Sequence, residues 1–232
     1  RGHEVRQIDL LAQAVSAASL RQAVRDMAPD VIGVSMRNID NVDSLSAAGS
    51  WTLDVARDWV AVLRQASTAP VVLGGPAFSI MPEEILAHLG ADYGVAGEGE
   101  RVFCDLIQQL EQGKPPTERI SNGRSSPIPG GELLPPLLEP ALVRFYLEQS
   151  GMLSLQSKRG CPHACDYCSY PSLEGPRYRS RDPAAVVDDL ARMQRDFGAS
   201  TVFFTDSVFN DSAGHYLEVA EAMVRSSVNL RW

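Results

Sequence analysis

Long apolar segments, cysteines and basic residues are all scarce in this 232-residue chain. No stretch approaches the roughly 18 to 20 consecutive apolar residues that cross a bilayer, and no charged cap precedes an apolar core at the start, so we expect neither a membrane span nor a signal peptide. The 21 Lys and Arg are outnumbered by 29 Asp and Glu, and the net charge of −8 argues against general nucleic-acid binding and favours a small neutral or cationic ligand. With 44% apolar and 22% charged residues, the composition fits one or two globular domains.

In the first half of the chain, apolar residues alternate between the spacing of strands and the spacing of helices. We expect strands and helices in turn at residues 5–10, 11–27, 31–36, 53–63, 70–73, 82–89, 93–96 and 101–110. This alternation predicts an α/β fold, a doubly wound (Rossmann/flavodoxin-like) parallel sheet with helices on both faces. A ligand of such a sheet lies beyond the carboxyl ends of the strands. The residues at those ends include Ser35, Gly74, Gly75, Gly97, Glu98 and Gly99.

The middle of the chain has the composition of a linker, because seven of the 15 prolines lie between Pro115 and Pro140. We therefore place a first domain at residues 1–113, a linker at 114–140 and a second domain at 141–232. In the second domain we expect helices and strands in turn at residues 141–148, 152–156, 183–197, 201–205, 212–225 and 228–232. The chain opens at Arg1 without an initiator Met and ends on an expected strand, so we expect a fragment of a longer protein.

Three of the four cysteines form the motif CxxxCxxC, at Cys161, Cys165 and Cys168, on a short loop after an expected strand. Three thiolates hold three irons of a 4Fe-4S cluster and leave the fourth iron open for a substrate or cofactor. Zinc is the alternative, because His163 would complete a set of three cysteines and one histidine, although structural zinc loops usually come as paired CxxC knuckles. Three unrelated buried thiols would require the spacing to be a coincidence. We interpret the remaining Cys104 as a small core residue of its helix.

The stretch KRGCPHACDYC, from Lys158 to Cys168, resembles the radical S-adenosylmethionine superfamily. The resemblance implies that the three cysteines bind the cluster, and that the amino and carboxylate groups of S-adenosylmethionine chelate the open iron. One-electron reduction would then cleave the sulfonium to a 5'-deoxyadenosyl radical. The resemblance also implies that the second domain is the first part of a β/α barrel, a partial TIM barrel.

The first domain resembles the cobalamin-binding domain that precedes the radical domain in one large subclass of this superfamily. The resemblance is carried by GHEVRQIDL, PDVIGVSMRN, VVLGGPAFSIMPEE and ADYGVAGEGE. It implies that cobalamin is contacted by Ser35, Gly74, Gly75, Gly97, Glu98 and Gly99. Glycine at such positions lets a corrin or nucleotide tail approach the backbone closely. His3 and Phe78 do not identify the lower ligand of cobalt, which the sequence leaves open.

The same resemblance implies contacts to S-adenosylmethionine from Tyr167, Asp206 and Asn210. Tyr167 precedes the third cysteine, where relatives touch the adenine, and a half-buried aromatic residue is the alternative. Asp206 and Asn210 lie in FFTDSVFN after an expected strand, where a carboxylate of a parallel barrel points into the active site. A helix cap or a turn is the alternative for Asp206. A solvated loop face is expected for the local basic stretch of Arg177, Arg179 and Arg181.

Together these features imply a cobalamin-dependent radical S-adenosylmethionine enzyme, with a methyltransferase as the leading interpretation. It would act on an unactivated carbon of a lipid or natural-product precursor, with methylcobalamin as the methyl donor. A radical cyclase or rearrangement enzyme with the same cofactors is one alternative, and a zinc-stabilised, non-catalytic binding module is another. The expected partners are a small-molecule substrate and an electron donor such as flavodoxin or ferredoxin, and a reducing cytoplasm would preserve the cluster. No side chain is assigned to catalysis.

Overall fold

The computed structural model describes residues 2–40 and 51–232, and the chain divides into two compact units. One unit consists of Ser16–Pro127 and Ala164–Gly175, and we call it the sheet unit. The other consists of Arg1–Val15, Ile128–His163 and Pro176–Trp232, and we call it the barrel unit. The expected first domain includes residues 1 and 41–50, which lie outside the described residues. Within the described ranges, every helix falls short of the length and apolar character that a bilayer crossing needs.

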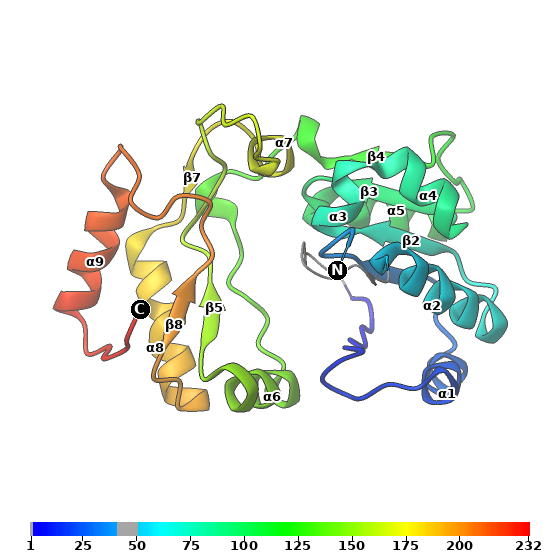
Figure 1. The fold of residues 1–232 in the computed structure, drawn as a ribbon, viewed down its shortest axis with the longest axis horizontal. Coiled ribbons are helices and arrows are strands. Elements are labelled where there is room, and N and C mark those ends of the chain that lie inside the picture. The colour runs from blue at the N-terminus through cyan, green and yellow to red at the C-terminus, as the bar shows by residue number, and fades with distance from the viewer. Residues whose placement is uncertain (1, 41–50) are drawn as a thin grey trace. The chain divides into compact units, whose positions relative to one another are not determined.

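The sheet unit is built on four parallel strands (Figure 1). They lie in the order β1 (Ile32–Ser35), β2 (Val71–Gly74), β3 (Tyr93–Ala96) and β4 (Ile120–Asn122). The first three confirm the expected strands, and their parallel register confirms the expected sheet. The fourth strand lies inside the expected linker. The prolines and glycines of the linker lie on either side of β4 and not within it, so the linker composition concealed this three-residue strand.

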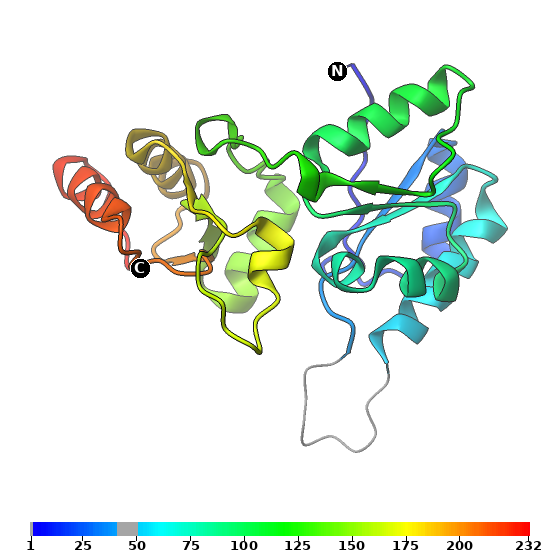
Figure 2. The same cartoon turned by 90° about the horizontal axis from the view of Figure 1, so that it is seen from above.

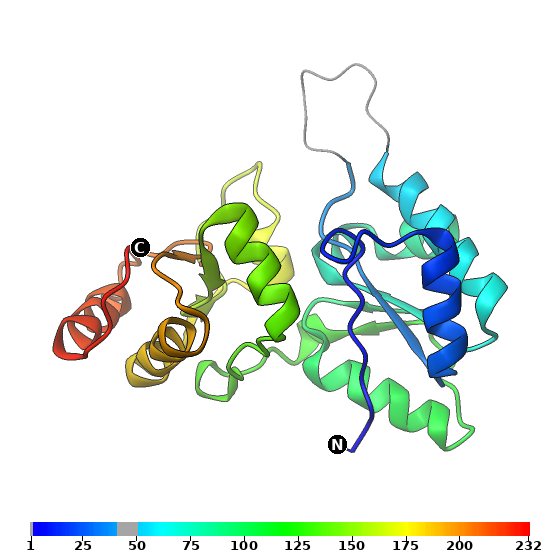
Figure 3. The same ribbon diagram turned by 90° about the horizontal axis from the view of Figure 1, so that it is seen from below.

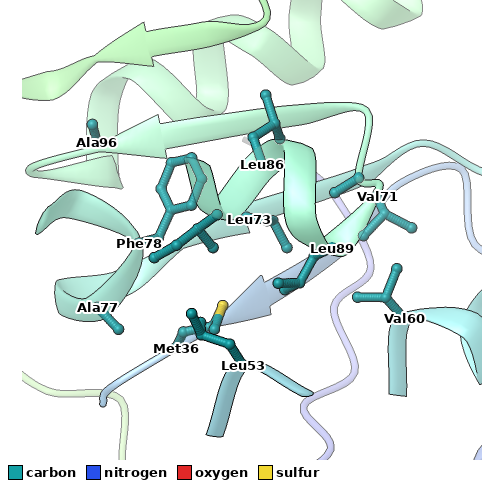
Figure 4. Packing of buried hydrophobic residues seen from close by; sticks show 12 residues of the cluster. Met36, Leu53, Val60, Val71, Leu73, Ala77, Phe78, Leu86, Leu89 and Ala96 are labelled. Atoms are coloured by element: carbon teal, nitrogen blue, oxygen red, sulfur yellow. The ribbon is translucent and has the colours of Figure 1, made fainter. Parts of the chain in front are cut away.

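Helices cover both faces of this sheet, because alternate residues of β2 face opposite sides. Val71 and Leu73 pack with α2 (Thr52–Ala66), α3 (Gly75–Ile80) and α4 (Pro82–Leu89) in a core that Figure 4 shows. Val72 faces the other way and packs against Leu106 of α5 (Gly99–Glu111). Figures 2 and 3 show α5 on one side of the sheet, with α2 on the other. The helix α3 is a correction, since the sequence GGPAFS was expected to be a loop.

The start of the chain also differs from expectation. Residues 5–10 form no strand, because the carboxylate of Asp9 accepts hydrogen bonds from the backbone N–H groups of Leu11 (3.0 Å) and Ala12 (2.8 Å) and turns the chain. The helix expected at residues 11–27 is α1 (Ala17–Met27). It begins later because Ser16 and Ser19 form a reciprocal cap, in which each side chain accepts from the other residue's backbone N–H.

The barrel unit contains a strand, helix and strand in the order that builds a β/α barrel. Parallel strands β5 (Leu153–Leu155) and β8 (Val202–Phe204) are joined through α8 (Pro183–Phe197), which Asp182 caps by accepting from Ala184 N at 2.7 Å. Two further helices belong to this unit, α6 (Pro140–Ser150) and α9 (His215–Arg225). Instead of the strand expected at residues 228–232, the structure has a single bridge between Thr201 and Arg231.

A short antiparallel pair has one strand before the cysteine motif and one after it. It consists of β6 (Lys158–Arg159) and β7 (Arg179–Ser180), which share only two residue pairs. The cysteine motif lies after β6 and before the five-residue helix α7 (Tyr170–Glu174). Two single-turn 3-10 helices, η1 (Gly123–Ser125) and η2 (Gly130–Glu132), complete the described elements. Next to the two residue pairs of β6 and β7, the backbone N–H of Arg181 donates to the Ser157 carbonyl at 3.0 Å and extends the contact by one residue.

Candidate functional site

The three cysteines of the motif are free thiols in different surroundings. Cys161 is 5% exposed and follows β6, whereas Cys165 is exposed and Cys168 is partly buried. The backbone N–H of Cys168 donates to the carbonyl of Cys165 at 3.0 Å, which closes a turn that leads into α7. Tyr167 projects into solvent with 91% exposure, so it is not the half-buried aromatic residue that was the alternative interpretation.

Two tyrosines lie near these sulfurs, and the pKa of each phenol is raised. The pKa of Tyr167 is raised, first by its hydrogen bond with Cys165 and then by the charges of Cys165 and Cys168. The pKa of Tyr178 is raised mainly by burial, with smaller contributions from the charges of Cys161 and Asp211. Each of the three sulfurs is therefore near a phenol that keeps its proton at neutral pH.

The donor set of this loop suits an iron–sulfur cluster by its chemistry. Soft thiolates are the ligands that such clusters prefer, and all three thiols are reduced and unpaired with one another. His163, the fourth ligand of the zinc alternative, is exposed. Among residues 2–40 and 51–232, no three His, Cys, Asp or Glu side chains are already arranged to hold a metal ion. The assignment of the cysteines therefore rests on their spacing and softness and stays a prediction.

Asp206 lies just after β8, as expected, but its side chain is completely buried. Its carboxylate accepts from Ser157 N at 2.6 Å, from Ser157 Oγ at 2.5 Å and from Lys158 N at 3.2 Å. Asn210, four residues later, is exposed. A contact from Tyr167, Asp206 or Asn210 to S-adenosylmethionine stays a prediction.

Sequence reasoning missed the buried charges around Asp206. Lys158 is 1% exposed, and its ammonium lies 3.0 Å from Asp211 Oδ2 and 3.5 Å from Asp206 Oδ2. Burial alone would raise the pKa of Asp211, but the hydrogen bond and charge of Lys158 hold it below the usual value. The only available signal was a lysine next to the motif, and its acidic partners lie about fifty positions away in the sequence.

The expected basic loop face needs a correction at two positions, Arg179 and Arg181. Arg181 is 6% exposed, and its guanidinium lies 2.5 Å from Asp189 Oδ2 and donates to the Gln156 carbonyl at 3.1 Å. Arg179 donates to the Ile128 carbonyl, whereas Arg177 is exposed. Only Arg177 thus has the expected solvated position, because backbone carbonyls hold the guanidinium groups of Arg179 and Arg181, and Asp189 also holds that of Arg181.

The six residues expected to contact cobalamin follow the carboxyl ends of β1, β2 and β3, at one edge of the sheet unit. Ser35 pairs with Gly74 in the register of β1 and β2. Gly75 has φ +91°, and a Cβ there would lie 2.5 Å from the carbonyl oxygen of Met36, so only glycine fits. Gly97 likewise has φ +85° and a close neighbour in the backbone of Arg124. These two glycines are required by the fold itself, and contact with cobalamin from this edge stays a prediction.

Ser79, which sequence reasoning also missed, joins α3, the helix that directly follows β2, to the loop after β3. Its buried hydroxyl donates to the Gly75 carbonyl at 2.8 Å and accepts from Gly97 N at 2.9 Å. The guanidinium of Arg124, which follows β4, donates to the Ser79 carbonyl. The segments that follow β2, β3 and β4 are thereby held together at the carboxyl edge. A serine inside a short helix gives no sequence signal for such a role.

Comparison with known proteins agrees with the order of these parts along the chain. The B12 binding domain family matches residues 1–107. The tryptophan 2-C-methyltransferase of Streptomyces laurentii is 27% identical over 89% of this chain and 44% of its own length. The hopanoid C-3 methylase of Methylococcus capsulatus is 26% identical over 100% of this chain and 44% of its own length. This chain thus spans less than half the length of these relatives.

Solved structures of the radical S-adenosylmethionine methyltransferase TsrM from Kitasatospora setae share the architecture. The structure with tryptophan substrate and a SAM analog bound matches with a TM-score of 0.81 at 25% identity, over 97% of this chain and 45% of that one. The structure with cobalamin and a [4Fe-4S] cluster bound matches with a TM-score of 0.80 at 26% identity, over 97% and 47%. The parallel sheet unit, the barrel unit and the cysteine motif occur together in this chain, which therefore belongs to the radical S-adenosylmethionine superfamily, in the group that carries a cobalamin-binding domain.

Proposed function

We propose that this chain forms the cofactor-binding part of a cobalamin-dependent radical S-adenosylmethionine enzyme. The observation that carries the proposal is the succession of two features. A parallel sheet presents glycine-bearing loops at its carboxyl edge, and a loop with three free thiols follows a strand further along the chain. The relatives named above, one of which was solved with cobalamin and a [4Fe-4S] cluster, support this combination.

Each part has a defined task in this proposal. Cys161, Cys165 and Cys168 bind a 4Fe-4S cluster, and the segments that Ser79 joins receive cobalamin. When bound, the cluster supplies one electron to S-adenosylmethionine at its open iron, and cobalamin carries the methyl group. Tyr167, exposed beside the thiols, packs on the bound nucleotide, and Asn210 contacts it from the loop after β8. The raised pKa of Tyr167 keeps its phenol neutral near the anionic cluster.

The reaction we propose is methyl transfer to an unactivated carbon of a small lipid or natural-product precursor, in a reducing cytoplasm. Electrons would come from a flavodoxin or ferredoxin. Two of the relatives are named as methylating enzymes, one acting on tryptophan and one on a hopanoid, which supports methyl transfer over rearrangement.

The first test concerns the cluster and uses the fourth cysteine as a matched control. After anaerobic reconstitution we expect about four iron and four sulfide per chain, with visible absorbance from thiolate-to-iron charge transfer. Cys168→Ala should lose most of both, whereas Cys104→Ala, which removes a thiol from α5, should retain them. Stoichiometric zinc without sulfide would instead support the non-catalytic binding module.

The second test concerns methyl transfer and needs no knowledge of the substrate. The reconstituted protein, loaded with reduced cobalamin, is mixed with S-adenosylmethionine that carries a deuterated methyl group. We expect trideuteromethyl-cobalamin by mass spectrometry. Formation of 5'-deoxyadenosine with no labelled cobalamin would contradict the methyltransferase and favour the cyclase or rearrangement enzyme.

A further inference from the structure

Lys158 is a charged side chain in a place where an apolar one would be expected. It lies three residues before Cys161 and is 1% exposed. Its ammonium donates to the Phe209 carbonyl at 2.7 Å and lies 5.2 Å from the centre of the Phe209 ring. Asp211 Oδ2 lies 3.0 Å away as well, so a carbonyl oxygen, an aromatic ring and a carboxylate all contact the ammonium. The lysine therefore ties β6 to the loop that follows β8.

The carboxylate of Asp206 accepts hydrogen bonds from residues at and just before the start of β6. An ionised carboxylate offers about four acceptor positions. Oδ1 accepts from the backbone N–H groups of Ser157 and Lys158, and Oδ2 accepts from Ser157 Oγ, with Lys158 Nζ at 3.5 Å. The Asp206 side chain is 0% exposed, and Ser157 is 0% exposed as well. Hydrogen bonds thus occupy three of these positions, and the Lys158 ammonium faces Oδ2 as well.

From these contacts we infer that Lys158, Asp206 and Asp211 are positioning residues, which fix the end of β6 and hold Cys161 in its buried position. The inference rests on the proposed role of Cys161 as a cluster ligand, and it assigns Asp206 an action through Cys161 and not through contact with S-adenosylmethionine. The strand β6 shares two residue pairs with β7, and one further backbone hydrogen bond, from Arg181 N to the Ser157 carbonyl at 3.0 Å, extends this short contact. Lys158, Asp206 and Asp211, which we call the brace, add anchorage from outside the strand.

Charge-matched substitutions can separate the effect of the brace on Cys161 from a general loss of stability. Lys158→Met alone leaves two buried carboxylates without their cation and is expected to unfold the unit in part. The double variant Lys158→Met with Asp211→Asn removes one charge of each sign. The amide oxygen of the introduced asparagine can still accept from Ala213 N, as Asp211 Oδ1 does at 2.9 Å. Met193→Ala, which truncates a fully buried core residue of α8, is the control for stability loss without a change in the brace.

The readout is the protection of Cys161, measured with and without the cluster. Metal-free protein is treated with iodoacetamide, and the labelling rates of Cys161 and Cys165 are compared by peptide mass spectrometry. In the wild type, buried Cys161 should react about tenfold more slowly than exposed Cys165. The double variant should regain most of the Tm lost in Lys158→Met, yet its Cys161 should react at nearly the rate of Cys165. In reconstituted protein the same variant should release iron to a chelator about tenfold faster than the wild type.

Three outcomes would overturn the inference. The double variant could protect Cys161 as the wild type does, or Met193→Ala at equal Tm loss could expose Cys161 equally. The third concerns Asp206→Asn: if Cys161 stays protected while binding of S-adenosylmethionine weakens, Asp206 contacts the cofactor and the brace assignment is wrong. A wild-type protein that takes up no iron and sulfide contradicts the proposed function instead, and the labelling of Cys161 in metal-free protein still decides the role of the brace.

Discussion

Replacing Gly94 with alanine should destabilise the sheet unit through a collision with one ring. Gly94 lies in β3, and a Cβ there would lie 2.6 Å from Phe78 Cε1 and closer still to Phe78 Cζ. Phe78 is 0% exposed and is packed among the buried residues between α3, α4 and the sheet (Figure 4), so its ring has nowhere to retreat. Overpacking of this kind costs about 3 kcal/mol, at the upper end of its usual range.

A second substitution tests the cause. Phe78→Leu alone should cost about 1.5 kcal/mol, because a smaller side chain leaves unfilled volume in the core. In the Gly94→Ala background the same change should stabilise the protein, because a leucine leaves room for the new methyl group. The coupling between the two sites should therefore reach about 2 to 3 kcal/mol and reverse the sign of the Phe78 effect.

Urea denaturation followed by far-ultraviolet circular dichroism measures these free energies. Gly90→Ala is the matched control: Gly90 has φ +64° with no heavy atom within 4 Å of an added Cβ. Its cost of about 1 kcal/mol comes from backbone strain alone and should not change with Phe78→Leu. If Phe78→Leu destabilises the Gly94→Ala protein as much as the wild type, the steric explanation is refuted.

The remaining predictions concern polar contacts. The pKa of Asp211 is lowered, since the contacts with Lys158 outweigh the effect of burial, so its ionised form stabilises the fold above its unfolded pKa near 3.8. That contribution is lost as the pH falls through the lower folded pKa. The difference in Tm between wild type and Asp211→Asn should therefore be constant near neutral pH and shrink in acid. A difference that widens in acid would contradict the assignment. Ser79→Ala removes a donor to Gly75 and an acceptor for Gly97, so it should cost about 2 kcal/mol in urea denaturation, and a loss below about 0.5 kcal/mol would show that the hydroxyl does not join the segments.

The parts of the fold that sequence predicted are those whose signals are local. The helix Pro82–Leu89 begins with proline and ends at Gly90, and both of its boundaries were predictable. Residues 5–10 alternate like a strand but lie in a segment where Asp9 turns the chain, so the pattern alone was misleading. The helix α3 was missed because a Gly-Pro start is as typical of turns as of helices.

For the candidate site, too, only the features with a local signal were predictable. The cysteines were found from their spacing within eight residues, whereas the contacts around Lys158 join positions about fifty residues apart. From the sequence alone, Lys158 and Ser157 would be placed at the surface, where lysine and serine usually lie. Their burial follows only when β5 and β8 pair and bring Ser157 beside Asp206. Tertiary contact of this kind has no local pattern, and so neither Lys158 nor Ser79 was predicted.

The carboxylate of Asp211 serves two elements at once. Oδ2 faces the Lys158 ammonium, while Oδ1 accepts from Ala213 N at 2.9 Å and from His215 N at 3.4 Å, where α9 begins. One planar group therefore links the first turn of a helix to the strand that leads into the cysteine motif. Disturbance at either side is transmitted to the other, so amide hydrogen exchange at the first turn of α9 can report on events at Cys161 without a probe on the loop itself.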